Sequence, residues 1–197
     1  MGNLRSVRNA LEAAGAEVCV TSRSEDLQRA ERIVLPGVGA FAQGMRNLEA
    51  SGLVEALRTE VLDRGKPFLG ICLGLQLLAR EGRENGSRAG LGWLGGIVER
   101  LRVEGKGLKV PHVGWNEIEI VMDSPLFAGL GGAPSFYFVH SYHMVCDGDD
   151  TVAGTCDYGG PFTALVLKGN ILGTQFHPEK SQTNGQRLLR NFIRWRS

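Results

Sequence analysis

Residues 67–81 read PFLGICLGLQLLARE, and this stretch decides the fold class. Its first part, Pro67–Ile71, is a short apolar run, typical of a β-strand buried on both faces. Its second part, Leu73–Glu81, has the composition of a helix. Strands buried on both faces occur mainly in parallel sheets that helices cover. The stretch therefore predicts an α/β fold with Cys72 at the junction of a strand and a helix.

The segments upstream alternate in the same way. Asn3 is a suitable N-cap for a helix that ends before Gly15. Strands are predicted at 16–21 and at 32–35, where Pro36-Gly37 ends the second one. A further amphipathic helix runs over 53–65. Strands alternating with helices predict a parallel, doubly wound sheet.

In the second half of the chain, the sequence predicts short strands separated by turns instead of alternating strands and helices. Lys168-Gly169-Asn170 is typical of a hairpin turn, and a helix over 184–195 closes the chain. The strands are predicted at 97–101, 117–121, 136–139, 163–167 and 171–175. This half predicts an antiparallel excursion from the mostly parallel sheet. Without repeats or linkers, residues 1–197 are predicted to form a single domain.

Composition narrows the functional classes. The chain has 197 residues, 43% of them hydrophobic, and a formal net charge of +1. A nearly neutral chain lacks the excess of basic residues that is typical of proteins that bind nucleic acid. The longest mostly apolar stretch, residues 67–79, is too short to span a bilayer. The sequence therefore predicts a protein that binds neither nucleic acid nor a membrane.

The cysteine pattern predicts a reduced, cytoplasmic protein with neither a zinc site nor a redox dithiol, and no metal or cofactor is expected. No two of the four cysteines have the Cys-x-x-Cys spacing of zinc or redox sites. Cys19, Cys146 and Cys156 lie in short apolar segments and are expected to be buried core thiols.

Cys72 is the exception, because Gly70 and Gly74 flank it where the strand turns into the helix. This is the pattern of a nucleophile elbow, with cysteine in place of serine. A thiolate at a helix N-terminus is also favoured by the helix dipole. A buried cysteine between two packing glycines is the alternative.

A nucleophile needs a base and a group that orients the base. His177 and Glu179, two residues apart just after a predicted strand, provide both; in extended chain they point to the same side. A histidine is more often a surface or core residue than a catalyst, so the pair gains weight only from Cys72.

A glycine-rich turn, PGVGAF at 36–41, directly follows another predicted strand. Its backbone N–H groups are suited to hold a developing oxyanion. A phosphate cradle is the rival interpretation, but the Lys-Ser/Thr of a P-loop is absent. A plain turn at the end of a strand is the third possibility.

Taken together, three segments resemble the class I (triad) glutamine amidotransferases: PGVGAF (36–41), GICLGLQLL (70–78) and QFHPEKS (175–181). Within that class, PHVGWN (111–116) and the Glu-Lys-Ser after His177-Pro178 are similar to the glutaminase subunits of imidazole glycerol phosphate synthase, which act in histidine biosynthesis. The resemblance runs in order from Asn3 to the C-terminal helix.

The resemblance implies hydrolysis of glutamine to glutamate and ammonia. Cys72 would attack the carboxamide and form a thioester, His177 would act as base and acid, and Glu179 would hold the imidazole. The other implied positions are the oxyanion-binding N–H groups of Leu73 and the Val38-Gly39 turn, and the substrate-binding residues Gln76, Glu84, Ser141 and Tyr142. A solvated helix residue and a loop carboxylate are the ordinary interpretations of Gln76 and Glu84.

The resemblance also implies a partner. The ammonia would pass to a (β/α)8-barrel cyclase in a heterodimer, and Trp115, Asn116, Tyr137 and Lys180 match the positions that face it. Tyr137 fits equally well as a core aromatic of a strand.

The start of the chain departs from the family pattern. The family begins with a buried strand and a turn, of which only Gly2-Asn3 remains here, so the first family strand is apparently missing. A misassigned start is the expectation, because an unpaired strand edge is costly. Other interpretations of the whole chain are an amidotransferase of another pathway, a cysteine hydrolase, or a non-enzymatic scaffold derived from a glutaminase.

Overall fold

A six-stranded mixed sheet forms the centre of the protein, which is described by a computed structural model over residues 4–196. Three strands are parallel: β1 (Ile33–Gly37), β2 (Phe68–Cys72) and β12 (Ile171–Thr174). The sheet continues with antiparallel β11 (Pro161–Lys168), β10 (Val152–Asp157) and β7 (Glu119–Ile120). The α/β class, with an antiparallel excursion in the second half, is confirmed.

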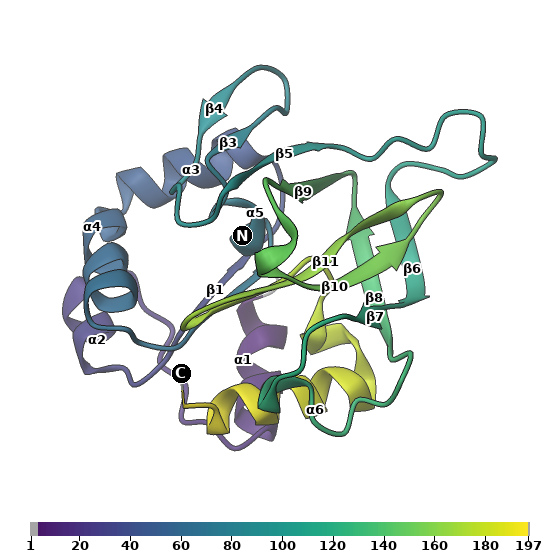
Figure 1. Ribbon diagram of the computed structural model, residues 1–197. Helices are drawn as coiled ribbons and strands as arrows, with labels where there is room; N and C mark the ends of the chain where they lie inside the picture. Colours follow the sequence, from purple (N-terminus) through teal and green to yellow (C-terminus); the bar gives the residue numbers. More distant parts are fainter. Residues whose placement is uncertain (1–3, 197) are drawn as a thin grey trace.

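Helices cover both faces of this sheet (Figure 1). One core cluster joins α1 (Leu4–Ala13) and α6 (Gln182–Arg194) to strand residues such as Leu69 and Ile71. Another core cluster, containing Phe68, is completed by α2 (Ser24–Arg29), α3 (Phe41–Ala50) and α4 (Leu53–Arg58). Because successive strand residues point to opposite faces, the apolar run 68–72 contributes to both cores.

Smaller elements surround the central sheet. A second sheet contains β4 (Arg88–Ala89), β3 (Glu81–Gly82), β5 (Gly96–Arg100) and β9 (Tyr142–Cys146), and a separate antiparallel pair joins β6 (His112–Glu117) to β8 (Ser135–His140). Short turns of helix are α5 (Leu73–Gln76), the π-helical η1 (Thr59–Asp63) and the 3₁₀-helices η2 (Pro125–Phe127), η3 (Asp149–Thr151) and η4 (Pro178–Lys180). Within residues 4–196, none of the helices has the length and apolarity needed to cross a bilayer.

The predicted strand at 16–21 is wrong, because this segment forms no ladder in the structure. β1 is the last strand on that side of the sheet, and residues 16–21 form no ladder with its open edge, although Ala16 and Val18 pack against the core. The prediction that Cys19 is buried fails with it, since Cys19 is exposed. The predicted N-cap, Asn3, lies outside the described residues.

Other differences are local. The strand at β1 runs through Pro36 to Gly37 instead of ending before them; an end strand tolerates proline because its open edge needs no N–H donor. The helix predicted at 73–81 has only one turn, α5, before β3 begins at Glu81. The helix after Leu53 changes to π-helical turns at Thr59. The hairpin turn at 168–170 is present, with Lys168 paired to Ile171.

Candidate active site

Cys72 lies on a strained turn between β2 and α5. Its backbone has φ +54° and ψ −106°, a combination that L-residues other than glycine rarely adopt. Such strain persists only where the surrounding structure enforces it, and it is common at functional sites. The side chain is only 6% exposed.

Two flanking glycines allow this turn. A Cβ on Gly74 would lie 1.8 Å from the backbone O of Leu35, and a Cβ on Gly70 would lie 2.8 Å from the backbone O of Gly74. The helix after Cys72 is therefore in backbone contact with β1 as well as with β2. In the parallel register, Gly37 is opposite Cys72, so β1 and β2 end side by side at this residue.

His177 follows β12, the strand on the other side of β2. The contact to Glu179 is made within the 3₁₀ turn η4 rather than along an extended chain, and His177 Nδ1 donates to Glu179 Oε1 at 2.8 Å. Both side chains are almost fully buried. The other ring nitrogen, Nε2, is buried without a hydrogen-bond partner of normal geometry among the described residues.

The charge state of His177 follows from its neighbours. Burial lowers its pKa, but the Cys72 sulfur and the Glu179 carboxylate outweigh burial and raise the pKa to about 9. At neutral pH the site therefore holds an imidazolium beside the sulfur, which is the arrangement that keeps a cysteine nucleophilic.

The predicted oxyanion residues lie next to this pair. Val38 and Gly39 directly follow β1, and Gly39 has φ +97°, which favours glycine. Leu73 is the first residue of α5, where backbone N–H groups have no partner within the helix. Glu84 lies at the same turn, because its Oε2 accepts the N–H of Phe41 at 2.8 Å, at the start of α3.

Gln76 is buried in a polar network that sequence reasoning missed. Its Nε2 donates to the backbone O of Tyr142 at 2.8 Å and to Gln175 Oε1 at 3.0 Å. Gln175 Nε2 in turn donates to Cys72 Sγ at 3.6 Å. The backbone O of Ser141 accepts the N–H of Leu101. Gln175 belongs to the motif that includes His177, but its place beside Cys72 follows from the parallel register of β2 and β12, for which the sequence holds no signal.

Two histidines extend the network. His140 Nδ1 donates to the same Tyr142 carbonyl at 2.9 Å, and its Nε2 therefore accepts from His112 Nδ1 at 3.2 Å. Burial lowers the pKa of His112 to about 4 and that of His140 to about 3, so both are neutral.

The residues predicted to face a partner lie beside the site on β6, β8 and η4. Trp115 is 48% exposed and packs edge-on against Tyr137, and the ammonium of Lys180 lies 5.5 Å from the centre of the Tyr137 ring. The backbone O of Tyr137 accepts the N–H of His177 at 2.9 Å. The side chain of Asn116 already has a partner within the chain, because its amide donates to the backbone O of Asp157.

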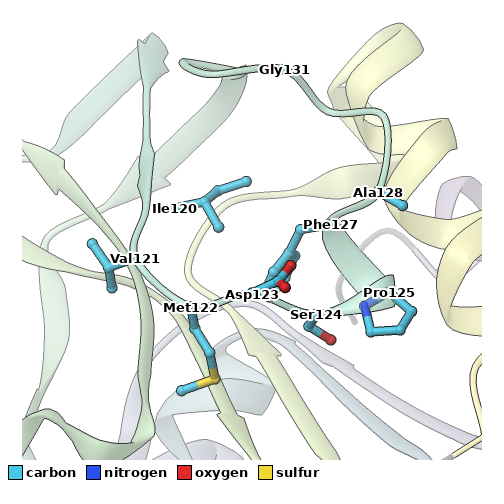
Figure 2. A pocket seen from close by; sticks show the side chains of 9 residues that line it. All are labelled: Ile120, Val121, Met122, Asp123, Ser124, Pro125, Phe127, Ala128 and Gly131. Atoms are coloured by element: carbon cyan, nitrogen blue, oxygen red, sulfur yellow. The ribbon is translucent and has the colours of Figure 1, made fainter.

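Two hollows differ in their chemistry. A cavity of about 120 Å³ is lined by His177, Glu179, the Pro36–Val38 turn, Ile71, Leu4 and Val7. A larger, open hollow of about 620 Å³ lies beside β7 and η2, and Figure 2 shows its lining side chains. Among the described residues that line that hollow, Asp123 is the one ionisable residue, and none is a predicted site residue. His177, Glu179 and the Val38 turn therefore line the small cavity, and the large hollow contains none of the predicted site residues.

Known proteins are similar to this chain over nearly its whole length. A family model described as glutamine amidotransferase class-I matches residues 1–195. Imidazole glycerol phosphate synthase subunit HisH of Rhodospirillum rubrum is 50% identical, over 98% of this chain and 94% of that protein. Subunit HisH 1 of Campylobacter jejuni (strain RM1221) is 47% identical, over 98% and 95%.

Solved structures agree. A crystal structure of a glutamine amidotransferase superposes with a TM-score of 0.74 at 25% identity, covering 98% of this chain and 93% of that one. A glutamine amidotransferase from Thermotoga maritima gives a TM-score of 0.62 at 21% identity, covering 91% and 81%, and supports the fold alone. The chain belongs to the class I glutamine amidotransferase family.

Proposed function

We propose that this chain is the glutaminase subunit of an imidazole glycerol phosphate synthase, with Cys72, His177 and Glu179 as its catalytic triad. The observation that carries the proposal is a strained cysteine next to a buried imidazole–carboxylate pair, in a chain about half identical to subunits of that synthase.

In the proposed first step, the Cys72 thiolate attacks the side-chain carboxamide carbon of glutamine. The carbonyl oxygen becomes an oxyanion, which the N–H groups of Leu73 and of the Val38-Gly39 turn would hold. As the tetrahedral intermediate collapses, the C–N bond breaks and the nitrogen takes the proton of the His177 imidazolium. Ammonia leaves, and a glutamyl thioester remains on the sulfur.

In the second step, neutral His177 accepts a proton from water, which attacks the thioester. The C–S bond breaks, glutamate is released, and the thiolate–imidazolium pair is restored. Glu179 keeps the imidazole oriented in both steps through its bond to Nδ1. Gln76, Glu84 and the 141–142 backbone are the proposed substrate-binding groups.

The ammonia is proposed to pass to a (β/α)8-barrel cyclase that makes imidazole glycerol phosphate and an aminoimidazole carboxamide ribonucleotide. The proposed contact surface is Trp115, Asn116, Tyr137 and Lys180. The reaction would take place in the cytoplasm; the free thiols of all four cysteines fit a reducing compartment.

The test is glutamate release from glutamine, measured for the chain alone and for its complex with a cyclase saturated with its nucleotide ligand. We expect turnover in the complex and none with Cys72→Ser. If the wild-type complex released no glutamate while both proteins were folded and associated, the proposal would be refuted.

Trp115→Ala is expected to weaken the partner complex by about tenfold or more, because exposed tryptophans are common binding hot spots. Half of the Trp115 side chain is solvent-accessible, so the fold should tolerate its loss. Isothermal titration with the cyclase measures the affinity, and a thermal melt checks the fold. Val121→Ala, at another exposed apolar residue, is the control. Equal affinities for the Trp115 variant and wild type would contradict the surface assignment.

A further inference from the structure

We infer that Gln175 holds the Cys72 thiolate, as a fixed N–H donor whose orientation is set by Gln76. This inference rests on the proposed function, in which Cys72 is the nucleophile. It adds a residue to the site beyond the triad and the oxyanion-binding groups.

The orientation of the Gln175 amide follows from its partners. A backbone carbonyl only accepts hydrogen bonds, so the contact with the O of Tyr142 identifies the Gln76 atom as Nε2. The second hydrogen on this nitrogen points to Gln175, whose contacting atom must then be the acceptor Oε1. The donor Nε2 of Gln175 is consequently left for the Cys72 sulfur.

Burial makes this orientation strict. Gln175 is completely buried and Gln76 is 6% exposed, so water cannot replace a lost partner. Turning the Gln175 amide over would bring two N–H groups together at Gln76 and an oxygen against the sulfur. A buried amide without its partners is costly. The two glutamines therefore keep one donor aimed at the sulfur in every turnover.

The strand register explains why Gln175 can reach the sulfur. Thr174, the last residue of β12, is paired with Ile71 of β2, so Gln175, the residue after β12, lies level with Cys72 at the end of β2. The backbone N–H of Gln175 is itself held by the O of Ala164 on β11. The side chain thus starts from a position fixed by strands on both sides.

Few other ionisable groups are placed to affect the charge of the Cys72 sulfur. Strands β1, β2 and β12 and helix α5 carry no ionisable side chain except Cys72. His177, paired with Glu179, interacts electrostatically with Cys72, and His140 lies close enough to His177 to respond to its charge. Removing the Gln175 donor should therefore change a thiolate that otherwise depends mainly on His177.

The experiment measures the rate of Cys72 alkylation by iodoacetamide against pH, on the chain alone. Gln175→Met keeps the volume and removes both polar ends, and Gln175→Glu keeps the acceptor for Gln76 but removes the amide donor. We expect the midpoint of the profile to rise by about one pH unit with Met, and further with Glu, which adds a negative charge. At a pH well below the midpoint this corresponds to an alkylation rate about tenfold slower.

Controls separate the outcomes. The background carries Cys19→Ser, because Cys19 is exposed, and labelling is assigned by peptide mass. Gln186→Met removes another glutamine amide, one that donates to the O of Ala10 far from the sulfur, and should leave the midpoint unchanged. A folded Gln175→Met with a wild-type midpoint would overturn the inference, even if its melting temperature fell. The measurement needs neither glutamine nor partner, so a failure of the proposed function appears separately, as silence of the wild-type complex.

Discussion

Replacing His177 by glutamine is expected to lower glutaminase kcat/KM of the partner complex by roughly 10² to 10⁴-fold. The amide can occupy the space of the ring but cannot carry a proton to the departing ammonia or take one from water. His143→Gln is the matched control, because His143 lies outside the hydrogen-bond network of the site and its ring packs against Phe162. Steady-state glutamate release measures both variants.

The protonation of His177 sets the direction in which glutaminase activity changes with pH. The pKa of His177 is raised to about 9, so the imidazolium persists through neutral pH and is lost as the pH rises through that value. The stability that the proton contributes is complete below the ordinary histidine pKa of about 6.5 and is lost on the same alkaline side. Glutaminase activity limited by proton donation should therefore fall above about pH 9.

Alkylation of Cys72 provides an independent check. With His177 present, Cys72 should react faster at neutral pH than in His177→Gln, because the neighbouring imidazolium stabilises the reactive thiolate. Identical profiles for the two proteins would contradict the thiolate–imidazolium pair. Cys156 should not interfere, since burial raises its pKa to about 12.

The central strands and the site motifs were predictable because their signals are local. The apolar run before Cys72, the glycines around it and the His-x-Glu pair need only a few consecutive residues to be recognised. Helix α3 also follows helical spacing, with Phe41, Met45 and Leu48 buried, so its omission was a missed pattern rather than a missing one.

What sequence reasoning could not supply depends on neighbours distant in the chain. Residues 16–21 have strand-like composition, yet pairing decides strands, and this segment pairs with none of the described strands. Glu84 reaches the start of α3 across 43 residues, and Gln76 meets Gln175 across 99. Such contacts follow from the register of the sheet, which the sequence pattern leaves open.

Gly74→Ala is expected to destabilise the fold by more than about 3 kcal/mol, because it forces two backbones apart. The new Cβ would lie 1.8 Å from the O of Leu35, and neither α5 nor β1 offers a flexible side chain that can move aside. The contact joins the helix after Cys72 to the strand before the Val38-Gly39 turn. In those variant molecules that still fold, we therefore also expect the strained turn at Cys72 to be lost. Urea denaturation measures stability, and Cys72 alkylation reports on the elbow.

Gly132→Ala is the control, since its Cβ meets nothing within 4 Å, and we expect a change within about 0.5 kcal/mol. An unchanged denaturation midpoint for Gly74→Ala would show that helix and strand can separate without cost, and would remove the packing argument for the elbow.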